Sequence, residues 1–232
     1  MKSLIVAAAL LVVCTAMPIH AADESKTEVQ ERLQSAAATL HELSATPDKG
    51  IPEEVYNGAK CIAVVPKMLK GGFILGGKHG RGVASCRLAN GTWSAPAFFS
   101  ISGGSWGLQA GVEDVDLVMM FMTPEGAQHL MQNKFQIGGS ISGAAGPVGR
   151  HASAGVDWKL DTQILTYSRA KGLFAGIDLE GSWIEHDNDS TKALYGKDVT
   201  TTAALTGEVP VPMEARGFIA EVARLRTEAE AR

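Results

Sequence analysis

Hydrophobic residues recur at every third or fourth position over residues 27–43, the spacing that gathers them on one face of an α-helix. These apolar positions are Val29, Leu33, Ala36, Leu40 and Leu43. Ser25 and Glu28 form the pattern of a capping box just before them. We therefore expect a first helix over residues 27–43. Similar reasoning predicts helices over residues 52–59, 124–132 and 213–229, the last with a core-facing stripe of Phe218, Val222 and Leu225.

The middle of the chain follows another pattern, because short apolar and β-branched segments there are interrupted by glycine. Of 26 glycines, 21 lie between Gly71 and Gly181. Glycine within strands marks bulges, bends and close backbone approach. The expected strands are residues 72–78, 81–88, 97–102, 116–122, 164–168 and 173–184, with a hairpin turn at Asn90-Gly91.

Most of these segments follow one another too closely for long helical crossovers, which favours antiparallel pairing. The sequence thus predicts an α+β fold, in which a curved, mostly antiparallel, glycine-rich β-sheet or partial barrel is flanked by N- and C-terminal helices.

The N-terminus has the features of a secretory signal peptide. Lys2 precedes an apolar run over residues 4–17, which is too short to cross a bilayer comfortably, and small residues follow at Ala21-Ala22. We expect residues 1–21 to be a signal peptide, 22–54 a helical segment and 55–232 a single domain. Export to the periplasm or cell envelope follows, with lipidation at Cys14 as the alternative.

Charge is distributed unevenly. Residues 55–112 contain no Asp or Glu but six Lys and Arg, although the whole chain has a formal net charge of -4. Such a local positive field favours an anionic partner. The other interpretation is a buried sheet, in which carboxylates are costly and the long cationic side chains reach outward to solvent.

Two cysteines, Cys61 and Cys86, remain after the signal peptide. An even number in an oxidising compartment favours one disulfide. Two buried thiols are the alternative, since cysteine also serves as a small core residue.

Several ordered motifs resemble the SYLF domain family. They are KCIAVVP at residues 60–66, WSAP at 93–96, GPVGR at 146–150, YSR at 167–169 and GLFAG at 172–176. The resemblance covers residues 55–232 and implies a lipid-binding module, since eukaryotic members bind phosphoinositides and some fungal members bind actin filaments. This chain differs from them in its signal peptide and its acidic first helix, and it is most similar to secreted bacterial members. The family supplies no catalytic residues.

The residues themselves suggest a compatible mechanism. Lys67 and Lys70 flank Met68 and Leu69, a pattern suited to a loop that inserts apolar side chains among lipid headgroups while cations meet phosphate. We predict a non-enzymatic envelope module that binds anionic phospholipid headgroups through basic, glycine-rich loops. The candidate lipid-binding residues are Lys60, Lys67, Lys70, Lys78, Arg81, Arg87, Arg150, Arg169 and Lys171. A structural or actin-binding-like factor that recognises a protein partner is the alternative function.

Enzymatic interpretations are weaker. Gly103-Gly104-Ser105-Trp106-Gly107 matches a nucleophile elbow, but the following residues continue as a strand instead of a helix, so a serine hydrolase using Ser105 is a remote alternative. Residues 72–78 have the spacing of a phosphate-binding loop, yet His79 replaces the magnesium-binding hydroxyl.

No cofactor or metal is predicted. The acidic run at residues 185–189 lacks metal-ligand spacing and is typical of a solvated turn that caps a short helix. Nucleic acid is not expected as a partner, because no dense basic stripe with interleaved aromatics is present. The four tryptophans, Trp93, Trp106, Trp158 and Trp183, suit either the core or a ligand contact, and the sequence leaves the oligomeric state open.

Overall fold

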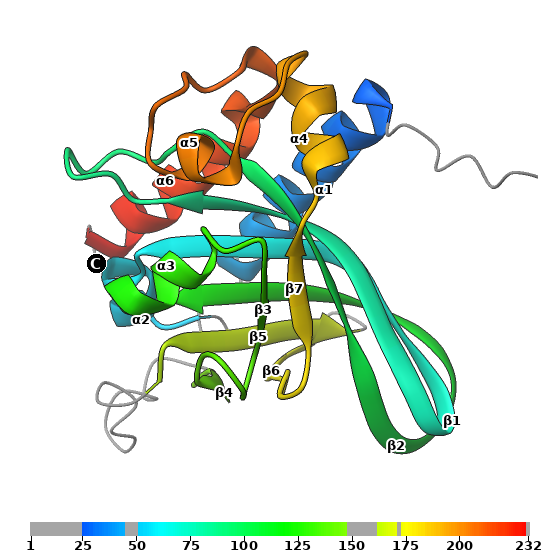
Figure 1. Ribbon diagram of the computed structural model, residues 1–232. Coiled ribbons are helices and arrows are strands. Elements are labelled where there is room, and N and C mark those ends of the chain that lie inside the picture. Colours follow the sequence, from blue (N-terminus) through cyan, green and yellow to red (C-terminus); the bar gives the residue numbers. More distant parts are fainter. Residues whose placement is uncertain (1–24, 45–50, 148–161, 171–172, 231–232) are drawn as a thin grey trace, which may run out of the picture.

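The computed structural model describes residues 25–44, 51–147, 162–170 and 173–230 (Figure 1). Its helices are α1 (Lys26–Ser44), α2 (Glu53–Gly58), α3 (Pro124–His129), α4 (Asn188–Tyr195), α5 (Thr201–Leu205), the 3-10 turn η2 (Met213–Ala215) and α6 (Arg216–Glu230). Its strands are β1 (Cys61–Cys86), β2 (Ala97–Phe121), β3 (Lys134–Gln136), β4 (Gly143–Ala145), β5 (Ile164–Ala170), β6 (Leu173–Gly176) and β7 (Trp183–His186). In the described ranges, no helix is both long and apolar enough to span a membrane.

Strands β1 and β2 form one long antiparallel hairpin that doubles back on itself (Figure 1). Pairing runs from Cys61 opposite Phe121 to Ala84 opposite Ala97. Glycine allows the two halves of β1 to approach, because a Cβ on Gly82 would lie 2.7 Å from the Val64 carbonyl oxygen. The glycine-rich pattern therefore builds a bent sheet.

A β-bulge contributes to the bend. Pro66 and Lys67 together oppose the single residue Asp116, since the register shifts between Val65 and Met68. Pro66 has no N–H to donate to the ladder, which suits a bulge. Lys67 adopts a left-handed backbone with φ of 53°, and its N–H donates to Asp116 Oδ1 at 3.1 Å. The carboxylate thus replaces the lost ladder bond.

The sheet curls because the two ends of β2 recruit different neighbours. Phe99–Ser102 pairs with β7, whereas Asp116–Phe121 pairs with β5. The strand order is β3-β7-β2-β5-β4, with β1 added to β2 and β6 to β5. Among the strands that the structure describes, only β4 and β5 pair in parallel. This seven-stranded mixed sheet with helices confirms the predicted α+β class.

Alternating side chains divide the interior into two cores. In the first core, Ile62 and Val64 of β1 pack with helix residues that include Leu33 and Leu40 of α1. The intervening residues of β1 point into the curl of the sheet. The second core includes Cys61, Ala63, Val65, Met68, Phe99, Ile101, Leu117, Met119 and Phe121. Helices α1 and α6 lie against one outer face of the sheet (Figure 1).

The helix predictions are largely confirmed. In the capping box, the Glu28 N–H donates to Ser25 Oγ at 3.2 Å and the Ser25 N–H donates to Glu28 Oε2 at 3.0 Å. The expected helix over residues 124–132 is shorter, ending at His129, and the last one begins with a 3-10 turn. The stripe of Phe218, Val222 and Leu225 is buried.

The strand boundaries are less accurate. The expected strands over 72–78 and 81–88 fall in the single strand β1, which ends at Cys86. Those over 97–102 and 116–122 fall in β2, which ends at Phe121, and the expected strand over 173–184 is divided between β6 and β7. Strands β3 and β4 and helix α5 were not expected. The Asn90-Gly91 turn is present, with Gly91 at φ 82°.

Candidate functional site

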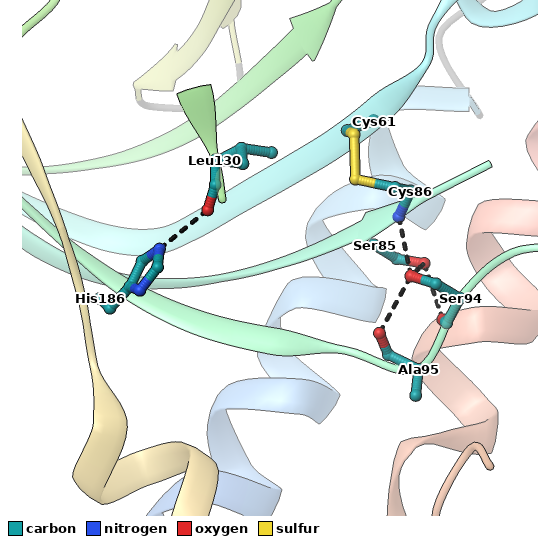
Figure 2. Close-up of a disulfide and its surroundings, with 7 residues drawn as sticks. All are labelled: Cys61, Ser85, Cys86, Ser94, Ala95, Leu130 and His186. Atoms are coloured by element: carbon teal, nitrogen blue, oxygen red, sulfur yellow. Dashed lines mark hydrogen bonds between the residues drawn. A yellow bond between two sulfur atoms is a disulfide. The ribbon is translucent and has the colours of Figure 1, made fainter. Parts of the chain in front are cut away.

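A disulfide joins Cys61 to Cys86, the first and last residues of β1 (Figure 2). Both cysteines are buried, and the Arg87 N–H donates to the Lys60 carbonyl at 2.7 Å beside them. The Ser94 hydroxyl accepts from the Cys86 N–H at 3.0 Å and so fixes the connection that follows β1. This cross-link joins the two ends of the strand that carries Lys67, Lys70, Lys78 and Arg81. Lys60 and Arg87 directly flank the same strand.

Those cations differ in exposure and in their partners. Lys60, Lys67 and Arg81 are exposed, Lys70, Arg87 and Arg169 are half-buried and Lys78 is buried, whereas Arg150 and Lys171 lie outside the described residues. Arg81, Arg87 and Arg169 all have internal partners. Burial lowers the pKa of Lys78, the charge of Lys70 contributes to this lowering, and the charge of Asp178 opposes it.

Arg169 on β5 is held by carboxylates. Its Nη2 and Nε donate to Asp116 Oδ2 at 2.8 and 3.1 Å, and its Nη1 pairs with Glu42 of α1. The same Asp116 side chain stabilises the bulge at Lys67. Arg169 therefore ties α1 to the bend of the sheet.

Arg81 contributes to a second network, centred on Asp187. Asp187 is 8% exposed, and its Oδ2 lies 3.1 Å from Arg81 Nε and 3.5 Å from Arg32 Nη1. It also caps α4 by accepting from the Ser190 N–H at 3.1 Å. The predicted cap is confirmed, but the predicted solvation is wrong at Asp187, because the two arginines allow this carboxylate to be buried.

The surroundings of Arg32 act on its pKa in opposite directions. Burial lowers the pKa of its guanidinium, and the charge of Asp187 opposes this effect. The Arg32 guanidinium also donates to Ser190 Oγ at 2.8 Å and stacks over the Phe98 ring at 5.6 Å. These contacts connect α1, α4 and the sheet.

Arg87 makes its contacts within the fold. Its guanidinium donates to the backbone carbonyls of Tyr56 and Asn57, both at 3.0 Å, and lies 5.3 Å from the Trp93 ring. These contacts hold α2 against the end of β1.

The enzyme-like motifs lie in the wrong local structure. Ser105 lies within β2, opposite Gly76, whereas a nucleophile elbow requires a sharp turn from a strand into a helix. Residues 72–78 likewise continue along β1. Within the described ranges, no group of three or more His, Cys, Asp or Glu could hold a metal ion.

The sequence named four tryptophans as candidates for the core or for ligand contact, but it did not indicate which of them is exposed. Trp183 on β7 is 41% exposed, while Trp93 is 6% exposed and belongs to the core. Lys134 Nζ lies 5.2 Å from the Trp183 ring and 3.3 Å from Glu185 Oε2. Alternation along β7 directs Trp183 outward and Ile184 inward. The side chain direction depends on register, which composition does not specify.

Comparisons with known proteins identify relatives of this domain. Residues 102–225 match the family model Ysc84, described as "Las17-binding protein actin regulator". SH3 domain-containing YSC84-like protein 1 of Rattus norvegicus is 32% identical over 195 residues, covering 82% of this chain and 57% of that protein.

Two yeast proteins give similar matches. Protein YSC84 of Saccharomyces cerevisiae is 36% identical over 168 residues, which are 71% of this chain and 36% of that protein. LAS seventeen-binding protein 3 of the same organism is 31% identical over 198 residues, or 84% of this chain and 43% of that protein. This chain thus spans a little over half of the rat relative and less than half of the yeast ones. It belongs to the Ysc84 family, the SYLF-domain family to which its motifs pointed.

Proposed function

We propose that the chain is a non-enzymatic protein-interaction module that docks a polypeptide partner through the surface around Trp183. The observation that carries this proposal is the 41% exposure of Trp183 within the part of the chain that matches the Ysc84 model. Large exposed aromatics are uncommon on protein surfaces and are enriched among the residues that dominate binding energy. The description of the matched family as Las17-binding actin regulators supports a polypeptide as the partner.

The neighbours of Trp183 support this role. Lys134 lies over one side of its ring and is itself paired with Glu185, so the aromatic is surrounded by polar groups from β3 and β7. A central aromatic with a polar rim is the usual organisation of a protein-binding hot spot.

The proposal can be tested with purified Las17 and with actin filaments. Trp183→Ala should weaken binding by roughly 30-fold, the effect of losing a hot spot of about 2 kcal/mol. Met213→Ala is the matched control, because Met213 is also a large exposed hydrophobic residue, at 76%. Equal binding by Trp183→Ala and the original protein, or no binding of either partner by the original protein, would refute the proposal.

Docking to anionic lipid is the second candidate, and it rests on Leu69. This residue is 50% exposed between the exposed Lys67 and the half-buried Lys70. Asp114 and Glu113 stand opposite Leu69 and Lys70 in the register, which reduces the local positive charge. We expect each lysine to contribute about 1 kcal/mol on an anionic surface.

Vesicle flotation separates this candidate from the first. Leu69→Ser combined with Lys67→Glu should abolish flotation with phosphatidylglycerol vesicles and leave binding to a protein partner intact. Flotation that persists in this variant would refute docking at the bulge.

Export of the chain is part of the same proposal. The predicted signal peptide, residues 1–21, lies outside the described residues, and a disulfide between Cys61 and Cys86 is consistent with an oxidising compartment. N-terminal sequencing and intact mass of the mature protein should give a start at Ala22. A start at Cys14 with attached acyl chains would instead establish lipidation.

A further inference from the structure

Strand β3 lies at one end of the strand order that the structure describes, beside β7 (Figure 1). Hydrogen bonds just beyond its two ends fix which backbone groups face β7. The Ile137 N–H donates to the Ser182 carbonyl at 2.9 Å, and the His186 N–H donates to the Asn133 carbonyl at 3.0 Å. Both bonds follow the register of the ladder between β3 and β7. Because bonded pairs alternate along an antiparallel ladder, the odd-numbered residues of β3 direct their N–H and C=O groups to β7.

The even-numbered residues of β3, Lys134 and Gln136, therefore direct their backbone groups away from β7. The Gln136 carbonyl agrees with this direction, because it accepts from the Ser140 N–H of the following turn at 2.9 Å. Among the described residues, the Lys134 N–H, the Lys134 C=O and the Gln136 N–H have no hydrogen-bond partner. Lys134 is exposed and Gln136 is half-buried. The outer edge of β3 thus presents two donors and one acceptor at the spacing that a neighbouring strand uses.

The charged side chain on this edge is held away from its free side. A lysine on an edge strand ordinarily discourages pairing with another chain. Lys134 Nζ, however, lies 5.2 Å from the Trp183 ring and 3.3 Å from Glu185 Oε2, and both of these residues belong to β7. The ammonium group is therefore drawn back over the sheet, and the backbone of β3 is left accessible on the other side.

We propose that an extended segment of a polypeptide partner pairs with the outer edge of β3 as an additional strand. This inference rests on the proposed protein-interaction function and specifies how the partner is held. Backbone bonds to Lys134 and Gln136 would supply affinity. Trp183 stands opposite Gln136 in the register, so alternate side chains of the added strand lie on the face that carries Trp183. The partner segment must lack proline at the residue whose N–H bonds the Lys134 carbonyl.

A second copy of the chain fits this edge less well than another polypeptide does. In an antiparallel pairing of two β3 strands, one register places Lys134 opposite Lys134 of the second copy, and like charges directly opposed are destabilising. Registers that bring Gln136 into the ladder need its carbonyl, which already accepts from the Ser140 N–H. A partner with a different sequence avoids the first restriction and can use the three open groups without the second.

Proline at position 134 tests the edge, because the Lys134 N–H faces outward and is not needed for the ladder with β7. Lys134→Pro removes this donor and places a ring on the free side of β3. Lys134→Ala is the matched control, since it loses the same side-chain contacts with Trp183 and Glu185 but keeps the N–H. Whichever of purified Las17 and actin filaments the original protein binds should be held at least about tenfold more weakly by Lys134→Pro than by Lys134→Ala. Equal affinities of the two variants overturn the proposal.

Amide hydrogen exchange measures the same contact without any substitution. In the free chain the N–H groups of Lys134 and Gln136 should exchange rapidly, whereas the Phe135 N–H, which faces β7, should be protected. Saturation with the bound partner should protect the amides of Lys134 and Gln136. Binding that leaves both amides exchanging as before overturns the added strand, even if Lys134→Pro fails to fold.

Comparison with Trp183→Ala separates this inference from the function on which it rests. If Trp183→Ala loses partner binding while Lys134→Pro and Lys134→Ala bind equally, the protein-interaction function stands and the added strand is overturned. Failure of the original protein to bind either Las17 or actin filaments refutes both. Protection of the Lys134 and Gln136 amides that increases with the concentration of the chain alone assigns the edge to a second copy, which also overturns the proposal.

Discussion

Reduction of the disulfide between Cys61 and Cys86 should strongly destabilise the protein. The cross-link connects the two ends of one strand with a sequence separation of 25. In the chain-entropy model, opening a loop of that size costs about 3.5 kcal/mol, because the unfolded chain regains its freedom. For a chain of this length, the melting temperature should fall by roughly 10 °C.

The folded contacts around the cysteines let the cross-link be separated from packing. Cys61 and Cys86 are both buried, so their thiols remain in the core after reduction. Urea unfolding of the oxidised protein, the reduced protein and the Cys61→Ala/Cys86→Ala variant should therefore show one large loss shared by the last two. Any further loss in the alanine variant reports the volume of the missing sulfur atoms.

The same experiment can refute this reasoning. If the oxidised and reduced proteins differ by less than about 1 kcal/mol, the loop is already constrained in the unfolded state and the entropic account fails. Hydrogen exchange of the Arg87 N–H gives a local check, since this group donates to the Lys60 carbonyl beside the bridge. Its protection should decrease on reduction.

Four further substitutions test individual contacts. Gly82→Ala should cost about 3 kcal/mol in thermal unfolding, because the new Cβ would lie 2.4 Å from Phe99 Cζ and 2.7 Å from the Val64 carbonyl oxygen; an unchanged melting temperature would show that the halves of β1 are not tightly packed. Asp187→Ala should cost about 3 kcal/mol in urea unfolding, since the carboxylate facing two arginines and capping α4 is lost. Tyr56→Phe should leave the free energy of unfolding equal or higher, because the buried hydroxyl has no hydrogen bond within the described residues, and a loss above about 1 kcal/mol would contradict this. Hydrogen bonding to Arg224 lowers the pKa of Glu221 below its ordinary 4.5. The Glu221 carboxylate therefore stabilises the fold above pH 4.5, and this stabilisation is lost as the pH falls through the lowered pKa. Urea unfolding from neutral to acidic pH should show a smaller loss of stability with acid for Glu221→Gln than for the original protein, and an equal loss would contradict the assignment.

The sequence predicted those elements whose signals are local. Helix α1 was clear because its apolar spacing and its capping box both depend on neighbouring residues. The length of β1 was not clear from the sequence, because glycines that permit a bend within a strand have the same sequence pattern as glycines that end one. Strands β3 and β4 have three residues each and are ordered by their partners β7 and β5 instead of by their own propensity.

The acid-free stretch over residues 55–112 shows why charge along a chain is a poor guide to charge in space. Antiparallel pairing brings Glu113 opposite Lys70, and Arg81 meets Asp187 although the two are far apart in sequence. A window without carboxylates can therefore be surrounded by them after folding.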